Sequence, residues 1–212
     1  FEAWIGSDGA EELDIMFLRS LVEEFPRVTF IPGNRDFLVS PEFTSNLGLE
    51  YQSKIIDPNF SIIHGDELCT DDIEYQNFRR MVRSSEWQRE FLEKPLSIRQ
   101  NIAKDLRRTS RINQKNLSEK ILDVAQPSVR KFFSLHKVPL LVHGHTHRPN
   151  MHLNQPHMRV VTSDWDTTGK VTLIEQNEHF LRVSLMHLGR WAPSLKKRFV
   201  YAFGTPEWNL NS

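Results

Sequence analysis

The sequence LLVHGHTH occupies residues 140–147 and carries the strongest structural signal of this chain. Its three leading apolar residues are typical of a short strand that is buried on both faces of a sheet. His145 and His147 follow beside a glycine, and neutral imidazole is a common ligand of Mn, Fe, Co and Zn. This strand end therefore predicts a metal site, with ordinary surface histidines as the alternative. His143 is either a hydrogen-bonding neighbour of that site or purely structural.

Two further segments share this design. Residues 28–31 (VTFI) run into Gly33 and Asn34, and residues 60–63 (FSII) run into His64 and a glycine. Glycine allows the chain to approach a ligand closely, and ligands of open α/β sheets collect at the carboxyl ends of strands. We therefore expect one shared metal site at the ends of neighbouring strands. Its expected ligands are Asn34, His64, His145 and His147.

Composition excludes several classes of protein. The 212 residues include 27 basic and 27 acidic side chains, so no overall field attracts nucleic acid. The single cysteine, Cys69, excludes an internal disulfide and favours a reducing compartment. No apolar run approaches the roughly 18 residues that a membrane-spanning helix needs. The first residue is not methionine, and we expect roughly 40 further residues upstream, enough for two strands and a helix.

Residues 69–124 are polar and predict a helical cap inserted into a core formed by residues 1–68 and 125–212. Thr70 before two aspartates predicts a helix start, with helix to about Glu93 and a break at Pro95. A second helix should place its apolar and basic residues on opposite faces, and a third should cover residues 117–124. The members of those two faces are Ile98, Ile102 and Leu106 (apolar) and Lys104, Arg107, Arg108 and Arg111 (basic).

The remainder of the chain predicts β-structure. Residues 159–162, 170–174 and 180–185 have the pattern of antiparallel strands. The basic and aromatic tail from Gly189 favours an edge strand or loop over a membrane-surface element.

Four blocks resemble, in order, the signature blocks of UDP-2,3-diacylglucosamine hydrolases, which are calcineurin-like metallophosphoesterases. They are FEAWIG (1–6), GNRDFL (33–38), HGDELCTDD (64–72) and HGHTHRP (143–149). The resemblance implies an α/β sandwich of two mixed β-sheets flanked by helices, with an inserted helical cap. It also implies two divalent metal ions, Mn²⁺ above all, as cofactors. The implied reaction, in lipid A biosynthesis, is attack of water on the α-phosphorus to release UMP and 2,3-diacylglucosamine 1-phosphate.

The resemblance also assigns roles to residues. Asn34, His64 and His145 would hold one metal and His147 the other. Arg35 and His145 would stabilise the charge that develops during catalysis. Arg35 stands where related phosphoesterases carry histidine, and it cannot donate a proton, which favours a phosphate leaving group. The alternative is a surface Arg35 paired with Asp36. The expected substrate contacts are Asn34, Arg35, Asp72, Ser110, Gln114 and His145.

Some features depart from the family pattern. The Asp-x-His and Gly-Asp motifs of the family would precede residue 1, and we expect these 212 residues alone to bind metal poorly. Gln114 and Leu117 stand where relatives often carry Asn and Lys. Apolar cap residues are expected either to line an acyl-chain pocket or to form ordinary core; these are Phe78, Met81, Val82 and Leu92.

The expected partners are a lipid-linked nucleotide sugar and an anionic membrane surface. The protein would be cytoplasmic and peripheral on the cytoplasmic face of the inner membrane. Seven basic residues between positions 99 and 120 favour either anion binding or a solvated helix face. Two other functions stay open: a calcineurin-like hydrolase of another nucleotide diphosphate or phosphodiester, and a non-catalytic module that binds membrane or a partner.

Overall fold

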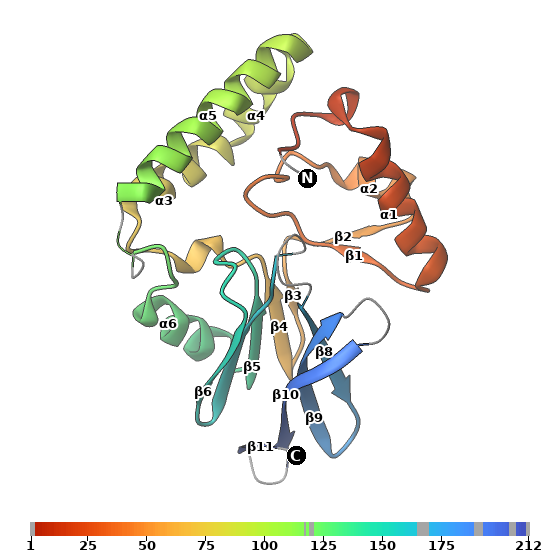
Figure 1. Ribbon diagram of the computed structural model, residues 1–212, viewed down its shortest axis with the longest axis vertical. Coiled ribbons are helices and arrows are strands. Elements are labelled where there is room, and N and C mark those ends of the chain that lie inside the picture. The colour runs from red at the N-terminus through yellow and green to blue at the C-terminus, as the bar shows by residue number, and fades with distance from the viewer. Residues whose placement is uncertain are drawn as a thin grey trace. The chain divides into compact units, whose positions relative to one another are not determined.

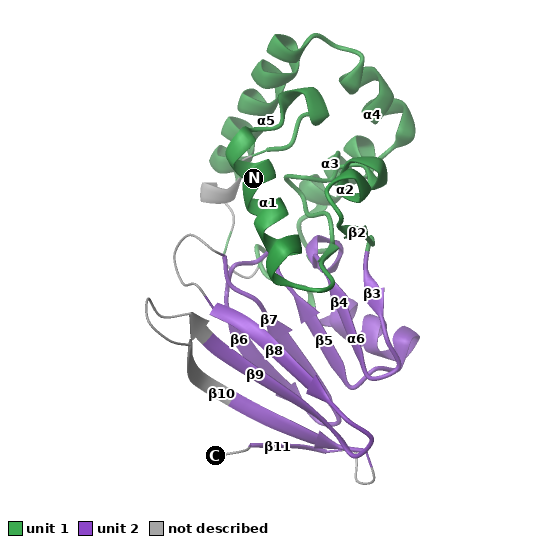
Figure 2. Ribbon diagram, turned by 90° about the vertical axis from the view of Figure 1, so that its right-hand side faces the viewer, with its two compact units in different colours: residues 1–53, 69–125 green, residues 54–68, 126–212 purple. Residues whose placement is uncertain are grey.

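The computed structural model describes residues 3–116, 118, 121–164, 170–188, 193–203 and 207–210. The side chains of residues 114–116, 187–188 and 193–197 lie outside this description. The chain forms two compact units, and each is assembled from two separate stretches (Figure 2). One contains residues 1–53 and 69–125, and the other contains residues 54–68 and 126–212.

A five-stranded mixed sheet forms the centre of the second unit (Figure 1). Its strand order is β3-β4-β5-β7-β6, and the three inner strands are parallel. All four residues of β5 are buried, as expected for an apolar run at the centre of a parallel sheet. The strands are β3 (Ile55–Ile56), β4 (Phe60–Ile63), β5 (Leu140–His143), β6 (Asn150–Asn154) and β7 (His157–Val161).

A four-stranded antiparallel sheet packs against the first one. Leu140 and Val160 of the first sheet share a buried cluster with Val183 and Phe199 of the second. On α6 (Gln126–His136), Phe133 stacks on His157 of β7 with ring centroids 4.5 Å apart. The expected sandwich is therefore present, but the second sheet is antiparallel in its described strands and not mixed. Its strands are β8 (Lys170–Gln176), β9 (Phe180–Leu188), β10 (Pro193–Ala202) and β11 (Trp208–Leu210).

The first unit is mainly helical. Its core joins Trp4 and Ile5 of the leading segment to Leu38 and Val39 after β1, and to Phe91 of the cap. The short strands β1 (Thr29–Phe30) and β2 (Glu50–Tyr51) pair in parallel. Its helices are α1 (Glu12–Glu24), α2 (Pro41–Asn46), α3 (Ile73–Val82), α4 (Ser85–Leu92) and α5 (Leu96–Asn116), with short 3₁₀ turns at Ser7–Gly9 and, in the other unit, Asp66–Leu68.

Residues 69–124 are largely helical, as predicted, but the helix boundaries differ. Asp72, and not Thr70, caps α3, because its Oδ1 accepts a hydrogen bond from the Tyr75 amide at 2.9 Å. The helix expected to reach Glu93 is broken, since Ser84 starts α4 by accepting from the Trp87 amide at 3.3 Å. Pro95 precedes α5, as predicted. The expected third helix is wrong where the structure describes it, because residues 121–123 form a turn.

The strand predictions after residue 155 are confirmed by β7, β8 and β9. The tail forms β10, which pairs with both β9 and β11, so it is an inner strand and not the edge strand or loop that was expected. The short strands β2, β3, β6 and β11 were not predicted, and neither were the helices α1, α2 and α6. The expectation that residues 28–31 form a neighbour of β4 and β5 is wrong: β1 pairs with β2 in a separate sheet. In the described part of the chain, every helix is too short or too polar to cross a membrane.

Candidate functional site

The carboxyl ends of β4 and β5 bring two predicted ligands together. Ile63 is in register with His143, so the residues after each strand leave the same edge of the sheet. The Gly144 amide donates to the His64 carbonyl oxygen at 2.9 Å and ties the two loops together. The rings of His64 and His145 lie with their centroids 5.1 Å apart at 69°. This separation and the nitrogen donors suit a shared divalent ion.

The turn that carries His145 and His147 has an uncommon backbone. Their φ angles are 64° and 52°, in the left-handed region that residues other than glycine rarely adopt. Such a residue costs on the order of 1–3 kcal/mol and persists only where its surroundings hold it. The Thr146 amide donates to the Gly144 carbonyl oxygen at 2.8 Å and closes the turn. Unfavourable backbone angles therefore occur at two of the predicted metal ligands.

Behind this turn lies His143, of which 1% is exposed. Its Nε2 lies 3.0 Å from Nη1 of Arg159, and its Nδ1 lies 2.9 Å from the Gly144 carbonyl oxygen. Both ring nitrogens of His143 thus have hydrogen-bond partners within the protein, and neither is left to ligate a metal. Gly65 packs on the same ring: its φ is +105°, and a Cβ there would lie 2.8 Å from His143 Nδ1. Only glycine fits this position without strain.

One carboxylate at this edge was not predicted as a site residue. Asp164 follows the buried strand β7, and its Oδ2 lies 3.8 Å from His147 Nδ1. A ligand-type side chain within a few residues of the end of a buried strand is the same kind of signal that identified His64, so the sequence could have indicated Asp164. Among the described residues, no three His, Cys, Asp or Glu side chains gather around one point. This unit therefore supplies the imidazoles of His64, His145 and His147, with the Asp164 carboxylate beside His147.

The Asn34–Arg35 turn belongs to the other unit and follows β1. Asp36 Oδ1 accepts from the Gly33 amide, and the Arg35 carbonyl oxygen accepts from the Trp4 amide at 2.7 Å. Burial raises the pKa of the Asp36 carboxyl. In the described structure no ion pair joins Asp36 to Arg35, so that alternative for Arg35 is wrong, and its guanidinium stays exposed. Convergence of Asn34 with the histidines stays a prediction.

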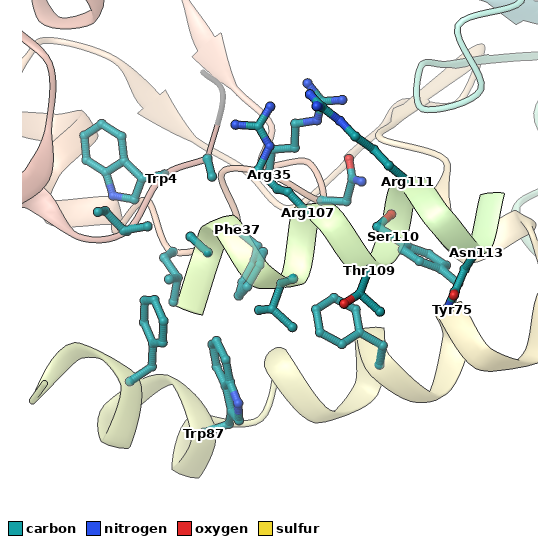
Figure 3. Close-up of a pocket in the computed structure, with 18 of the residues that line it drawn as sticks. Trp4, Arg35, Phe37, Tyr75, Trp87, Arg107, Thr109, Ser110, Arg111 and Asn113 are labelled. Carbon is teal, nitrogen blue, oxygen red and sulfur yellow. The ribbon is translucent and has the colours of Figure 1, made fainter. Parts of the chain in front are cut away.

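A pocket of about 300 Å³ opens beside this turn (Figure 3). The guanidiniums of Arg35, Arg107 and Arg111 lie at one side of it, and aromatic rings, among them Phe37 and Trp87, line another. Cationic and apolar linings in one pocket suit a ligand with both phosphate and hydrocarbon parts. The predicted substrate residues Asn34, Asp72 and Ser110 line the same pocket, whereas the side chain of Gln114 lies outside the described residues.

Helix α5 supplies lining residues that were not predicted as substrate contacts. The four basic residues expected on one face divide: Arg107 and Arg111 line the pocket, but Lys104 and Arg108 do not. The sequence could have indicated these two arginines: they are four residues apart, so they share one helix face, and Arg111 is next to the predicted substrate contact Ser110. On α3, Tyr75 also lines the pocket.

Of the four apolar cap candidates, only Phe78 lines the pocket. Val82 is buried core, and Met81 and Leu92 are exposed. Phe91 of α4, which was not among the candidates, is a lining residue. On α4 the apolar lining thus includes Phe91 in place of its expected neighbour Leu92.

Known proteins share these motifs over most of the chain. A family model described as calcineurin-like phosphoesterase matches residues 7–149. The UDP-2,3-diacylglucosamine hydrolase of Tolumonas auensis is 38% identical over 180 residues, covering 79% of this chain and 73% of that protein. The chain belongs to the UDP-2,3-diacylglucosamine hydrolase family of calcineurin-like phosphoesterases. The family member from Actinobacillus succinogenes is 41% identical over 183 residues, covering 81% of this chain and 77% of its own.

Among solved structures, a single mutant of Vps29 from Entamoeba histolytica aligns over 96% of this chain and 92% of that chain. The TM-score is 0.37 and the identity 12%, too low to bear on fold or function. Membership of the UDP-2,3-diacylglucosamine hydrolase family implies a hydrolase that uses divalent metal ions.

Proposed function

We propose that this protein hydrolyses the diphosphate of UDP-2,3-diacylglucosamine, in lipid A biosynthesis, to UMP and 2,3-diacylglucosamine 1-phosphate. The relatives that carry this name support the assignment. The observation that carries it is the pocket in which arginines lie beside an apolar, aromatic lining. A diphosphate with two acyl chains has the complementary chemistry.

The reaction places its demands on charge and not on proton donation. The oxygen of water bonds to the α-phosphorus and gives up its proton to the solvent, and the bond from that phosphorus to the bridging oxygen breaks. The bridging oxygen leaves with the sugar phosphate, which needs no proton because phosphate is a stable anion near neutral pH. Arg35 suits this step, since its planar guanidinium binds phosphate oxygens in pairs but releases no proton.

Metal binding is assigned to Asn34, His64, His145 and His147, and we propose two Mn²⁺ ions as the cofactor. Bound divalent ions supply Lewis-acid stabilisation of phosphoryl oxygens and lower the pKa of water. His145 also contacts the phosphoryl oxygens as charge develops there. Asn34, Asp72, Ser110 and Gln114 orient the nucleotide sugar.

A UMP-release assay on the whole protein tests the assignment. We expect turnover of UDP-2,3-diacylglucosamine with Mn²⁺ and its loss with a chelator. A panel with UDP-N-acetylglucosamine, a dinucleotide and a simple phosphodiester serves as the control. Faster turnover of any of these than of the acylated substrate would show that the protein is a different calcineurin-like hydrolase.

We also propose that the protein works on an anionic membrane surface, at the cytoplasmic face of the inner membrane. Two observations support it: the cap exposes Met81, Leu92 and Ile98, and basic side chains such as Arg80 and Lys94 stand near them in the chain. Apolar and basic side chains together favour adsorption to anionic lipid. Sedimentation with vesicles of phosphatidylglycerol, against vesicles of phosphatidylcholine, measures this. Equal binding to both would contradict it.

A further inference from the structure

A buried charge lies behind the turn that carries His145 and His147. Arg159 of β7 is 4% exposed, although its guanidinium is charged at every accessible pH. The residue is in register with Leu141 of β5, and its Nη1 lies 3.0 Å from His143 Nε2. A charge is kept inside a protein only when strong polar partners hold it. The contact with His143 is thus part of what keeps Arg159 in the sheet.

The chemistry of the guanidinium sets the direction of this hydrogen bond. Arginine carries only donors, so Arg159 donates and His143 Nε2 accepts. The ring hydrogen of His143 must then sit on Nδ1, which donates to the Gly144 carbonyl oxygen at 2.9 Å. Arg159 therefore determines which tautomer His143 adopts. That tautomer in turn supplies a donor to the Gly144 carbonyl.

The peptides of Gly144 connect the loops of three predicted ligands. The Gly144 carbonyl oxygen also accepts from the Thr146 amide at 2.8 Å, and the Gly144 amide donates to the His64 carbonyl at 2.9 Å. His145 and His147, on either side of Thr146, both have left-handed backbone angles. A backbone of this kind needs its surroundings to hold it.

We propose that Arg159 is a positioning residue for the metal site. Through His143 it holds the turn of residues 144–147 in the conformation that presents His145 and His147 to the metal. The inference rests on the proposed function for the assignment of these two ligands. It extends that function to a side chain on another strand, which contacts neither substrate nor metal. Hydrogen bonds behind metal ligands orient those ligands in many proteins.

The variant Arg159→Met keeps the length of the side chain and removes its donors. We expect the Mn²⁺ affinity of the whole protein to fall about 10–100-fold, the usual effect of losing a group that orients a ligand. Nitrogen NMR of the metal-free protein should show His143 protonated at Nδ1 in the wild type, and a mixture of tautomers in the variant. Arg159→Lys retains a charged donor group and should restore part of the affinity. Arg182→Met, on the other sheet, is the matched control and should change neither measurement.

Loss of Arg159 leaves a buried ring nitrogen unsatisfied, so the single variant risks unfolding. The double variant Arg159→Met/His143→Leu replaces both polar partners and should fold. It still lacks the donor to the Gly144 carbonyl, so we expect its Mn²⁺ affinity to stay low. Wild-type affinity in either folded variant would overturn the proposal, as would an unchanged His143 tautomer in Arg159→Met. These measurements follow Mn²⁺ affinity and the His143 tautomer, and neither depends on turnover. If the wild-type protein failed to hydrolyse the substrate, that result would therefore count against the proposed function and not against the role of Arg159.

Discussion

Arg35 is the residue whose chemistry most directly tests the proposed reaction. It lies exposed at the pocket, free of the ion pair with Asp36 that the sequence allowed. Replacing it with alanine should lower kcat/KM about 10–100-fold, since a hydrogen bond to a charged group is worth about 1.5–3 kcal/mol. The kcat/KM of Arg35→Lys should lie between those of the wild type and Arg35→Ala, because lysine keeps the positive charge but lacks the planar guanidinium that binds two oxygens at once. UMP release measures this, with Arg19→Ala on α1 as the control. Unchanged turnover in Arg35→Ala would make Arg35 a surface charge only.

Gly65 and Gly48 form a natural pair for testing the loop that bears His64. Both have positive φ angles, +105° and +81°, so alanine strains either backbone by about 1–3 kcal/mol. A Cβ at Gly65 would press on His143, whereas a Cβ at Gly48 would meet Val22 at 3.0 Å. We expect both variants to lose stability in urea, and only Gly65→Ala to lose Mn²⁺ affinity. If the two variants bound Mn²⁺ with equal affinity, Gly65 would have no role in shaping the metal site.

His157 gives a pH dependence of stability. Burial lowers its pKa below the ordinary value of 6.5, and its ring stacks on Phe133. As pH falls from 6.5, the unfolded chain takes up this proton before the folded protein does, so the free energy of unfolding decreases until the lower folded pKa is passed. His157→Phe keeps a ring without the titration. Urea unfolding of both proteins between pH 7.5 and 5 should show the wild type losing more stability. Parallel pH curves would contradict this.

At the scale of elements, Arg99 links α5 to the segment that contains Ile5 and Asp8, in the same unit. It is 3% exposed, and its guanidinium donates to Lys94 O and Asp8 Oδ1, each at 2.9 Å, and to Ile5 O. A Cβ at Gly6, where φ is 123°, would collide with this guanidinium. The hydrogen bond from Arg99 lowers the pKa of Asp8.

Arg99→Met should therefore destabilise the first unit by about 1–3 kcal/mol, mainly through carbonyl oxygens left without a donor. The expected loss of stability is this small because Asp8 is exposed to water, so its ion pair with Arg99 contributes little. Arg108→Met is the control on the same helix: its contact with Asp105 is 3.7 Å long and exposed, worth about 0–1 kcal/mol. Tryptophan fluorescence during urea unfolding measures both. A larger loss in Arg108→Met would refute this role of Arg99.

Elements differ in how far the sequence predicted them. The runs at β4, β5, β7, β8 and β9 were recognisable because buried or alternating apolar residues are a local signal. The break between α3 and α4 at Ser84 was not recognisable. A serine that caps a new helix leaves the pattern of polar and apolar residues unchanged, so the sequence around it still looks like one continuous helix. β1 was recognised as a strand and given the wrong neighbour, because pairing depends on distant residues. In the site, His64 and His145 were predictable from strand ends, whereas Arg159 looked like an ordinary β-strand residue.

At the scale of the molecule, metal should stabilise the fold by mass action. At a free concentration of 100 times its Kd, a ligand that binds only the folded state adds about 2.7 kcal/mol. Three predicted ligands lie in the unit that contains Trp208, and Asn34 lies in the unit that contains Trp4 and Trp87. We expect chelation to lower the thermal midpoint of both units.

Two variants would report the unfolding of each unit separately by tryptophan fluorescence. One keeps only Trp4 and Trp87, the other keeps only Trp208, and phenylalanine replaces the remaining tryptophans in each. A chelator should shift the fluorescence transition of each. The Asn34→Ala variant is the control, in which the shift of the Trp4 and Trp87 signal should disappear. A shift confined to Trp208 in the parent would remove Asn34 from the ligand set.

The interleaving of the two units has a consequence for protein synthesis. Arg99 bonds to Asp8, 91 positions earlier, and β4 must await β5 for its parallel partner. On a ribosome that adds about 5–20 residues per second, the leading segment and the β3–β4 hairpin emerge seconds before the chain that covers them. Their apolar side chains and strand edge are open during that interval. Slower translation would lengthen this exposure, so we expect the nascent chain to need chaperones more than the length of the protein suggests.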